Sequence, residues 1–171
     1  MSDIEIIKPG EIERQSFKII EDSLKAQGIS VPLNYAGATE AENELCRSII
    51  YRCIHTTADF DYARTLRFSG GSVDMIRKLI RDGADIITDT NMALTGINKK
   101  MLEKCGGRAY CFMADEDVAR EAKDRELTRA YVAMEKATSL HKAEAAKPMI
   151  FAIGNAPTAL ISLYDLYSKR L

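Results

Sequence analysis

The sequence has almost no net charge and no long apolar run, and each absence excludes a class of partner. It contains 24 lysines and arginines against 25 aspartates and glutamates, which gives a formal net charge of −1. No global field therefore gathers nucleic acid or an anionic lipid surface. No apolar stretch approaches the length that spans a bilayer, and the acidic N-terminus lacks the layout of a secretion signal. We expect a protein that binds neither nucleic acid nor membrane.

Cysteine and histidine are scarce, and the common catalytic motifs are missing. The four cysteines form no C-x-x-C pair, which favours reduced thiols and a cytoplasmic location. The two histidines are not part of an H-E-x-x-H motif, so we expect no metal site. The sequence also lacks a G-x-S-x-G elbow and the glycine patterns of nucleotide-binding loops. A cysteine–histidine pair stays open.

The chain has enough apolar residues for one core, since 46% of its 171 residues are hydrophobic. No repeat or linker divides it, so we expect a single domain over residues 1–171. Hydrophobic periodicity, capping residues and glycine stops predict these elements. Helices are expected at 11–27, 39–55, 72–83, 97–105, 116–143 (two helices or one bent helix) and from 157, and strands at 84–88, 108–113 and 148–153, with a further strand within 60–68.

Strands that alternate with helices predict a mainly parallel sheet in a three-layer α/β sandwich. Ligands bind such sheets beyond the carboxyl ends of the strands. Asp89 and Asn91 follow one predicted strand, and Gly154 and Asn155 follow another. For Asp89 or Asn155 alone, a turn residue that caps the next helix is the favoured interpretation, but two polar strand ends in one sheet shift the balance towards a pocket.

His55 lies at the far end of the predicted helix at 39–55. Without a metal or a nucleophile beside it, the chemistry open to a lone imidazole is proton transfer. Arg52 precedes it by three positions, so both side chains share one side of the helix. Arg52 either holds an anionic group beside the imidazole or pairs with a nearby carboxylate. Arg129 is a ligand-facing cation or an ordinary surface arginine.

Five stretches that occur in order resemble the precorrin-8X methylmutase (precorrin isomerase) family of cobalamin biosynthesis. GNAPTAL is the most specific of them, and the Arg-x-x-His context is next. The likeness runs from near residue 9 to near residue 165. The stretches are RQSFKII (14–20), RCIHTTADFD (52–61), ITDTNMALTGI (87–97), LTRA (127–130) and FAIGNAPTAL (151–160).

The resemblance implies an isomerase that moves a methyl group from C11 to C12 of precorrin-8X or cobalt-precorrin-8, giving hydrogenobyrinate or cobyrinate. It implies no cofactor, a flavodoxin-like fold and a homodimer whose pockets both subunits border. His55 matches the histidine that protonates the corrinoid macrocycle and takes the proton back. The substrate-binding positions implied are Ser16, Arg52, Asp89, Asn91, Met92, Arg129 and Asn155.

Two details modify that expectation. The sequence HTTADFD (55–61) resembles more closely that of family members that act on cobalt-containing intermediates. Family members generally continue past the helix after GNAPTAL, so the fold looks short at the C-terminus. This departure predicts an exposed sheet edge or apolar face near residues 149–165. It also leaves an alternative function, a non-catalytic corrinoid-binding protein derived from the family.

Overall fold

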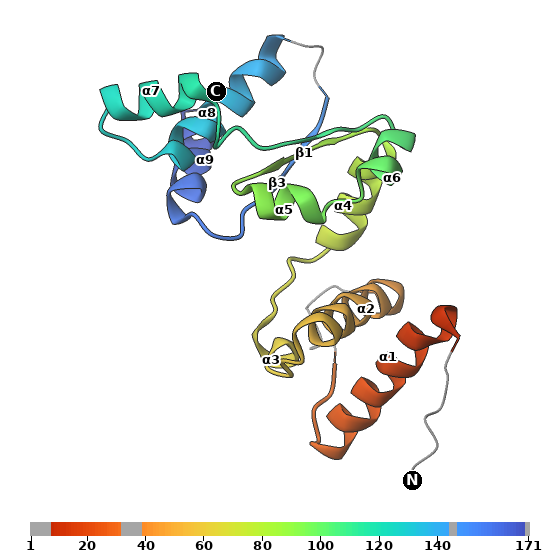
Figure 1. Ribbon diagram of the computed structural model, residues 1–171. Coiled ribbons are helices and arrows are strands. Elements are labelled where there is room, and N and C mark those ends of the chain that lie inside the picture. Colours follow the sequence, from red (N-terminus) through yellow and green to blue (C-terminus); the bar gives the residue numbers. More distant parts are fainter. Residues whose placement is uncertain (1–7, 32–38, 144–146, 170–171) are drawn as a thin grey trace. The chain divides into compact units, whose positions relative to one another are not determined.

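The computed structural model describes residues 8–31, 39–143 and 147–169. It divides the chain into two compact units, an N-terminal unit (Met1–Met75) and a C-terminal unit (Ile76–Leu171) (Figure 1). The predicted single domain over 1–171 therefore stays a prediction. The described part of the chain has no helix that is both long enough and apolar enough to cross a membrane.

The N-terminal unit is helical, with α1 (Pro9–Ala26), α2 (Glu40–Thr57) and α3 (Tyr62–Thr65). Pro9 occupies the first position of α1, where its missing N–H costs no hydrogen bond. At the start of α2, Thr39 Oγ1 accepts a hydrogen bond from the Glu42 N–H at 3.2 Å and so caps the helix. The Glu42 carboxylate accepts a hydrogen bond of 2.6 Å from the Gly71 N–H.

Apolar faces of α1, α2 and α3 form the core of this unit. Its buried members are Ile20, Leu24, Ile50, Tyr51, Ile54 and Ala63. The strand predicted within 60–68 is wrong, since this segment contains the helical turn α3. Its aromatic and apolar residues pack against the core, and a short sequence window does not distinguish their spacing from that of a strand.

The C-terminal unit contains a parallel sheet of β1 (Asp85–Thr88), β2 (Ala109–Tyr110) and β3 (Met149–Ala152). The strand order is β2-β1-β3, so β1 is central. In the register, Ile86 of β1 lies opposite Ala109 on one side and Ile150 on the other. The predicted α/β class with a parallel sheet is confirmed. Strand β2 is shorter than predicted.

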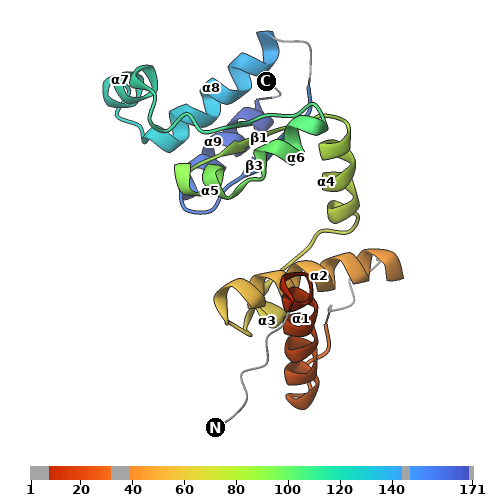
Figure 2. The same ribbon diagram turned by 45° about the vertical axis from the view of Figure 1, so that its right-hand side comes forward.

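Helices cover the sheet on both faces. Helices α7 (Glu116–Asp124), α8 (Arg129–Ala143) and α9 (Pro157–Ser168) gather on one side, where their apolar residues share a core with β1 and β3 (Figures 1 and 2). Helices α5 (Asn91–Gly96) and α6 (Lys99–Lys104) lie on the other side, as right-handed crossovers require. Helix α4 (Ser72–Arg81) spans the boundary between the units.

The predicted apolar face near residues 149–165 is present on α9. Several of its large side chains are exposed, Tyr164 at 70% among them. Strand β3 is also an edge strand of the described sheet. The exposed apolar residues of α9 are Leu160, Ile161, Tyr164 and Tyr167.

Candidate active site

His55 lies in the last turn of α2 and faces α1. Its Nδ1 is hydrogen-bonded to the Ser16 hydroxyl at 2.7 Å. With Nδ1 engaged, Nε2 is the ring nitrogen left to exchange a proton. The imidazole is exposed, so a molecule outside this unit has access to it.

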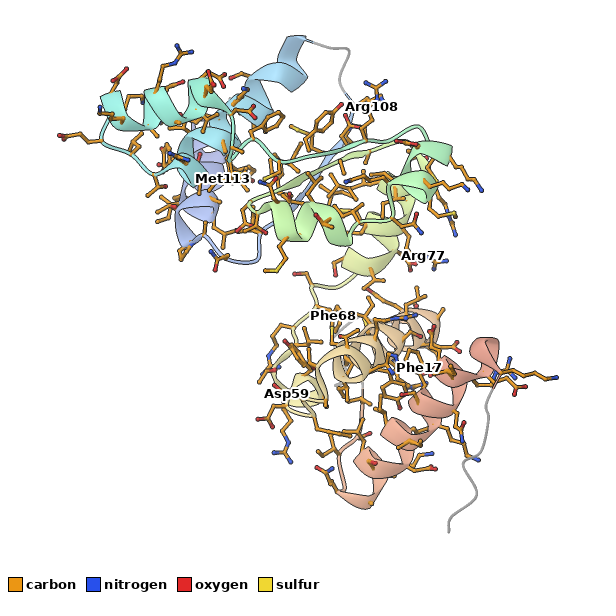
Figure 3. The ribbon with its side chains drawn as sticks, viewed as in Figure 1. Phe17, Asp59, Phe68, Arg77, Arg108 and Met113 are labelled. Atoms are coloured by element: carbon orange, nitrogen blue, oxygen red, sulfur yellow. The ribbon has the colours of Figure 1, made fainter. Side chains whose placement is uncertain are left out.

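Arg52 is held beside the imidazole by two groups of α1. Its guanidinium forms an ion pair with Glu13, and its Cζ lies 5.5 Å from the centroid of the Phe17 ring. The edge of Phe17 also meets His55, with ring centroids 6.1 Å apart and planes at 73°. Phe17, labelled in Figure 3, thus projects from α1 toward α2. Of the two expectations for Arg52, pairing with a carboxylate is observed.

Asp89 follows β1 and lies fully buried, with 0% of its surface exposed. Its carboxylate accepts hydrogen bonds from three successive backbone N–H groups after β3: Gly154 at 3.1 Å, and Asn155 and Ala156 at 2.8 Å each. Burial acts to raise the pKa of Asp89, but these three donors outweigh it and the pKa is lowered. The carboxylate is therefore charged and holds the loop 154–156 against β1.

The loop 154–156, which Asp89 holds, borders open space. A methyl group added at Gly154 would meet no heavy atom within 4 Å, and the Asn155 side chain is exposed. Together with the start of α9, this loop lines a shallow depression of about 220 Å³. Contacts within the described residues therefore do not require a glycine at this position.

Asn91 and Met92 open α5, directly after Asp89. Thr90 Oγ1 accepts a hydrogen bond of 3.1 Å from the Ala93 N–H and so caps this helix. Both Asn91 and Met92 are exposed, Met92 at 83%. A thioether this exposed is unusual for a residue that packs well in cores.

Arg129 is the first residue of α8 and is exposed. The preceding Thr128 shares a hydrogen bond of 2.7 Å with Thr158 in the first turn of α9, so the two helix starts are adjacent. A cation at a helix N-terminus opposes the macrodipole. Helix stability therefore does not account for this arginine.

The structure thus gathers the predicted site residues into two groups, one in each unit. Ser16, Arg52 and His55 contact one another or shared neighbours in the N-terminal unit. The other group lies around the carboxyl ends of β1 and β3 and comprises Asp89, Asn91, Met92, Arg129 and Asn155. The described residues contain no group of three or more side chains suited to hold a metal ion.

Sequence reasoning missed Glu13 and Phe17, which contact Arg52 and His55. A signal for them was present. Glu13 lies three positions before Ser16, and Phe17 lies one position after it. Residues 13, 16, 17 and 20 share one face of a helix. The apolar members of that face, Phe17 and Ile20, identify it as the side that packs against α2.

These features define an α/β protein with an exposed imidazole held by a serine and polar side chains at the carboxyl ends of parallel strands. The precorrin-8X methylmutase family model matches residues 11–171. The chain belongs to the precorrin-8X methylmutase family.

Individual relatives agree with the family match. The chain is 39% identical to a cobalt-precorrin-8 methylmutase of Salmonella typhimurium over 94% of its own length and 70% of that protein. It is 35% identical to the protein of that name from Priestia megaterium, with coverage of 95% and 64%. The chain therefore spans about two thirds of the length of the curated relatives that it matches. Each relative named here is a methylmutase, a kind of isomerase.

Solved structures share the fold. A crystal structure of precorrin-8X methylmutase from Thermus thermophilus superposes with a TM-score of 0.68 at 28% identity, covering 93% of this chain and 69% of that one. A structure described as a precorrin-8X methylmutase related protein superposes with a TM-score of 0.66 at 24% identity. The flavodoxin-like α/β expectation agrees with these likenesses.

Proposed function

We propose that this chain catalyses the migration of a methyl group from C11 to C12 of a corrinoid macrocycle. The substrate is cobalt-precorrin-8 or precorrin-8X, and the product is cobyrinate or hydrogenobyrinate. The cobalt form is favoured, because relatives at 39% and 35% identity are both named cobalt-precorrin-8 methylmutases. The observation that carries the proposal is the Ser16–His55 hydrogen bond in a chain of this family.

His55 is the proposed proton donor and acceptor. In the imidazolium both ring nitrogens carry a proton, so Nδ1–H donates to Ser16 Oγ and Nε2 is the nitrogen that loses and regains its proton. The imidazolium gives this proton to the conjugated ring, which becomes electron-poor and undergoes a 1,5 shift of the methyl group. Nε2 then takes a proton back from the product. The sum is an isomerisation, with no net change in protons or electrons and no cofactor required.

The remaining predicted residues bind or place the macrocycle. Its edge carries carboxylates, for which the guanidinium groups of Arg52 and Arg129 offer paired donors. Asn155 and Asn91 supply amide donors, and Met92 supplies an apolar surface for a flat ring. Ser16 orients the imidazole through its hydrogen bond to Nδ1, in addition to the substrate contact that the resemblance implies.

Asp89 has a different place in this proposal. Its carboxylate has no exposed surface and is occupied by three backbone donors, so it positions the loop 154–156 rather than touching the ring. The direct substrate contact expected for Asp89 has no support in this geometry. The substrate instead meets the loop that Asp89 holds.

We also propose a homodimer in the cytoplasm. The exposed apolar side chains of α9 form the kind of surface that buries itself in a partner. Four free cysteines agree with a reducing compartment. Light scattering after gel filtration tests the dimer, and a monomeric mass at micromolar concentration would contradict it.

The function is tested by incubating the protein with cobalt-precorrin-8 and following the absorption spectrum and the product mass. We expect wild type to convert the ring. His55→Ala should bind it, with a spectral shift, but lower turnover at least about a hundredfold. Because His55 is exposed, that variant should keep the wild-type melting temperature. Binding without conversion by wild type would instead identify a non-catalytic corrinoid binder, which the comparisons do not support.

A further inference from the structure

The ion pair with Glu13 occupies only part of the hydrogen-bonding capacity of the Arg52 guanidinium. Glu13 contacts it through one guanidinium nitrogen, Nη2. A guanidinium carries five N–H donors in a planar fork. Within the described ranges, Nε and Nη1 of Arg52 have no hydrogen-bond partner among the contacts found. One edge of the fork is therefore held, and the donors on its other side are available to a second carboxylate.

The aromatic ring of Phe17 contacts the face of the same guanidinium. Arg52 Cζ lies 5.5 Å over the ring of Phe17, a distance at which a cation is attracted to an aromatic face. The ring is itself held by an edge contact with Tyr51, with centroids 5.8 Å apart and planes at 77°. Tyr51 is only 7% exposed and belongs to the core. Two residues of α1 thus set the position of Arg52, and one of them also touches His55.

Stability does not explain the Glu13–Arg52 pair. The two side chains are 48% and 56% exposed, and ion pairs this exposed contribute little to the free energy of unfolding. A free arginine loses rotamer entropy when a ligand orders its side chain. A pair that orders Arg52 in advance removes part of that cost from substrate binding.

We propose that Glu13 is a positioning residue that holds Arg52 beside His55 so that the guanidinium accepts a carboxylate of the macrocycle. This inference rests on the proposed function. It predicts an effect on substrate affinity and none on proton transfer, since Glu13 does not contact the imidazole in the described structure.

The test compares Glu13→Gln with Glu11→Gln, which removes a charge from an exposed position of the same helix. We expect Glu13→Gln to raise KM about fivefold to tenfold with kcat within about twofold of wild type. The same loss should appear in the dissociation constant for cobalt-precorrin-8 measured by spectral titration in a His55→Ala background, where no turnover occurs. Glu11→Gln should change neither value.

A double-mutant cycle shows whether Glu13 acts through Arg52. Arg52→Ala should weaken binding more than Glu13→Gln, and adding Glu13→Gln to it should change affinity less than about twofold. Additive effects, a tighter-binding Glu13→Gln variant, or equal behaviour of Glu13→Gln and Glu11→Gln would each overturn the inference while leaving the proposed function intact. A wild-type protein that neither binds nor converts the ring would overturn the proposed function, and this inference with it.

Discussion

The hydroxyl of Ser16 on α1 lies 2.7 Å from Nδ1 of His55 on α2, 39 positions further along the chain. This contact ties the imidazole to the neighbouring helix and occupies Nδ1, whereas Nε2 takes no part in it. The two helices also share the buried core of the N-terminal unit. The orientation of the histidine therefore depends on the packing of α1 against α2.

We expect Ser16→Ala to lower kcat about fivefold to tenfold, because about 1 kcal/mol of orienting hydrogen bond is lost. Ser23→Ala on the same helix is the control and should leave kcat unchanged. Steady-state kinetics check the prediction. A raised KM with an unchanged kcat would show instead that Ser16 serves the substrate and not the imidazole.

Replacing Asp89 should destabilise the fold. In Asp89→Asn, an amide NH₂ replaces one acceptor and faces backbone donors after β3, so we expect a loss of about 2–3 kcal/mol in the free energy of unfolding at pH 7. Urea denaturation measures this loss. Asp124→Asn, at an exposed position at the end of α7, should change stability by less than about 0.5 kcal/mol.

The same carboxylate predicts a pH dependence. The pKa of Asp89 is lowered in the folded protein, below an unfolded value of about 3.9. Its contribution to stability is thus fully present above that value and is lost as the pH falls through the folded pKa. The difference in stability between wild type and Asp89→Asn should be largest near pH 7 and shrink below about pH 4. A constant difference from pH 7 to pH 3 would contradict this account.

Gly154 should matter to the ligand and not to the fold. Because an added methyl group meets open space, we expect Gly154→Ala to change the free energy of unfolding by less than about 1 kcal/mol. Affinity for cobalt-precorrin-8 should fall severalfold, since the methyl group would occupy the depression at this loop. Spectral titration and thermal melts separate the two effects. Unchanged affinity would place the ring elsewhere.

Gly107 is the opposite case. A Cβ at this position would lie 2.2 Å from the Ala84 carbonyl oxygen and 2.9 Å from a methyl carbon of Leu102. We expect Gly107→Ala to cost about 3 kcal/mol or more, because backbone must move to relieve the contact. Gly10→Ala in α1, where nothing lies within 4 Å, should instead stabilise the protein by about 0.5 kcal/mol. Equal melting temperatures for both variants would contradict this.

Regular elements with an apolar face were predictable from the sequence. Helix α1 and strand β1 follow the expected ranges, and the two-helix reading of 116–143 is confirmed by α7 and α8. Helix α5 was missed because none of its six residues is buried, so it leaves no apolar periodicity.

The site was only partly predictable. Its residue types came from a resemblance, and their local positions at strand and helix ends came from pattern. The role of Asp89 could not be predicted from the sequence, because its hydrogen-bond donors lie 65 to 67 positions further along the chain. Sequence pattern alone cannot show that a polar residue after a strand is covered by a distant loop. The contact of Glu13 with Arg52, 39 positions apart, is hidden for the same reason.

The attachment of Asp89 to its loop has a consequence for substitutions in that loop. All three of its hydrogen bonds go to main-chain N–H groups, which every amino acid except proline provides. The side chains of the loop, such as that of Asn155, take no part in this attachment, so the backbone should stay in place when one of them is replaced. A substitution at Asn155 can therefore remove a functional group without disturbing the conformation of the loop that carries it.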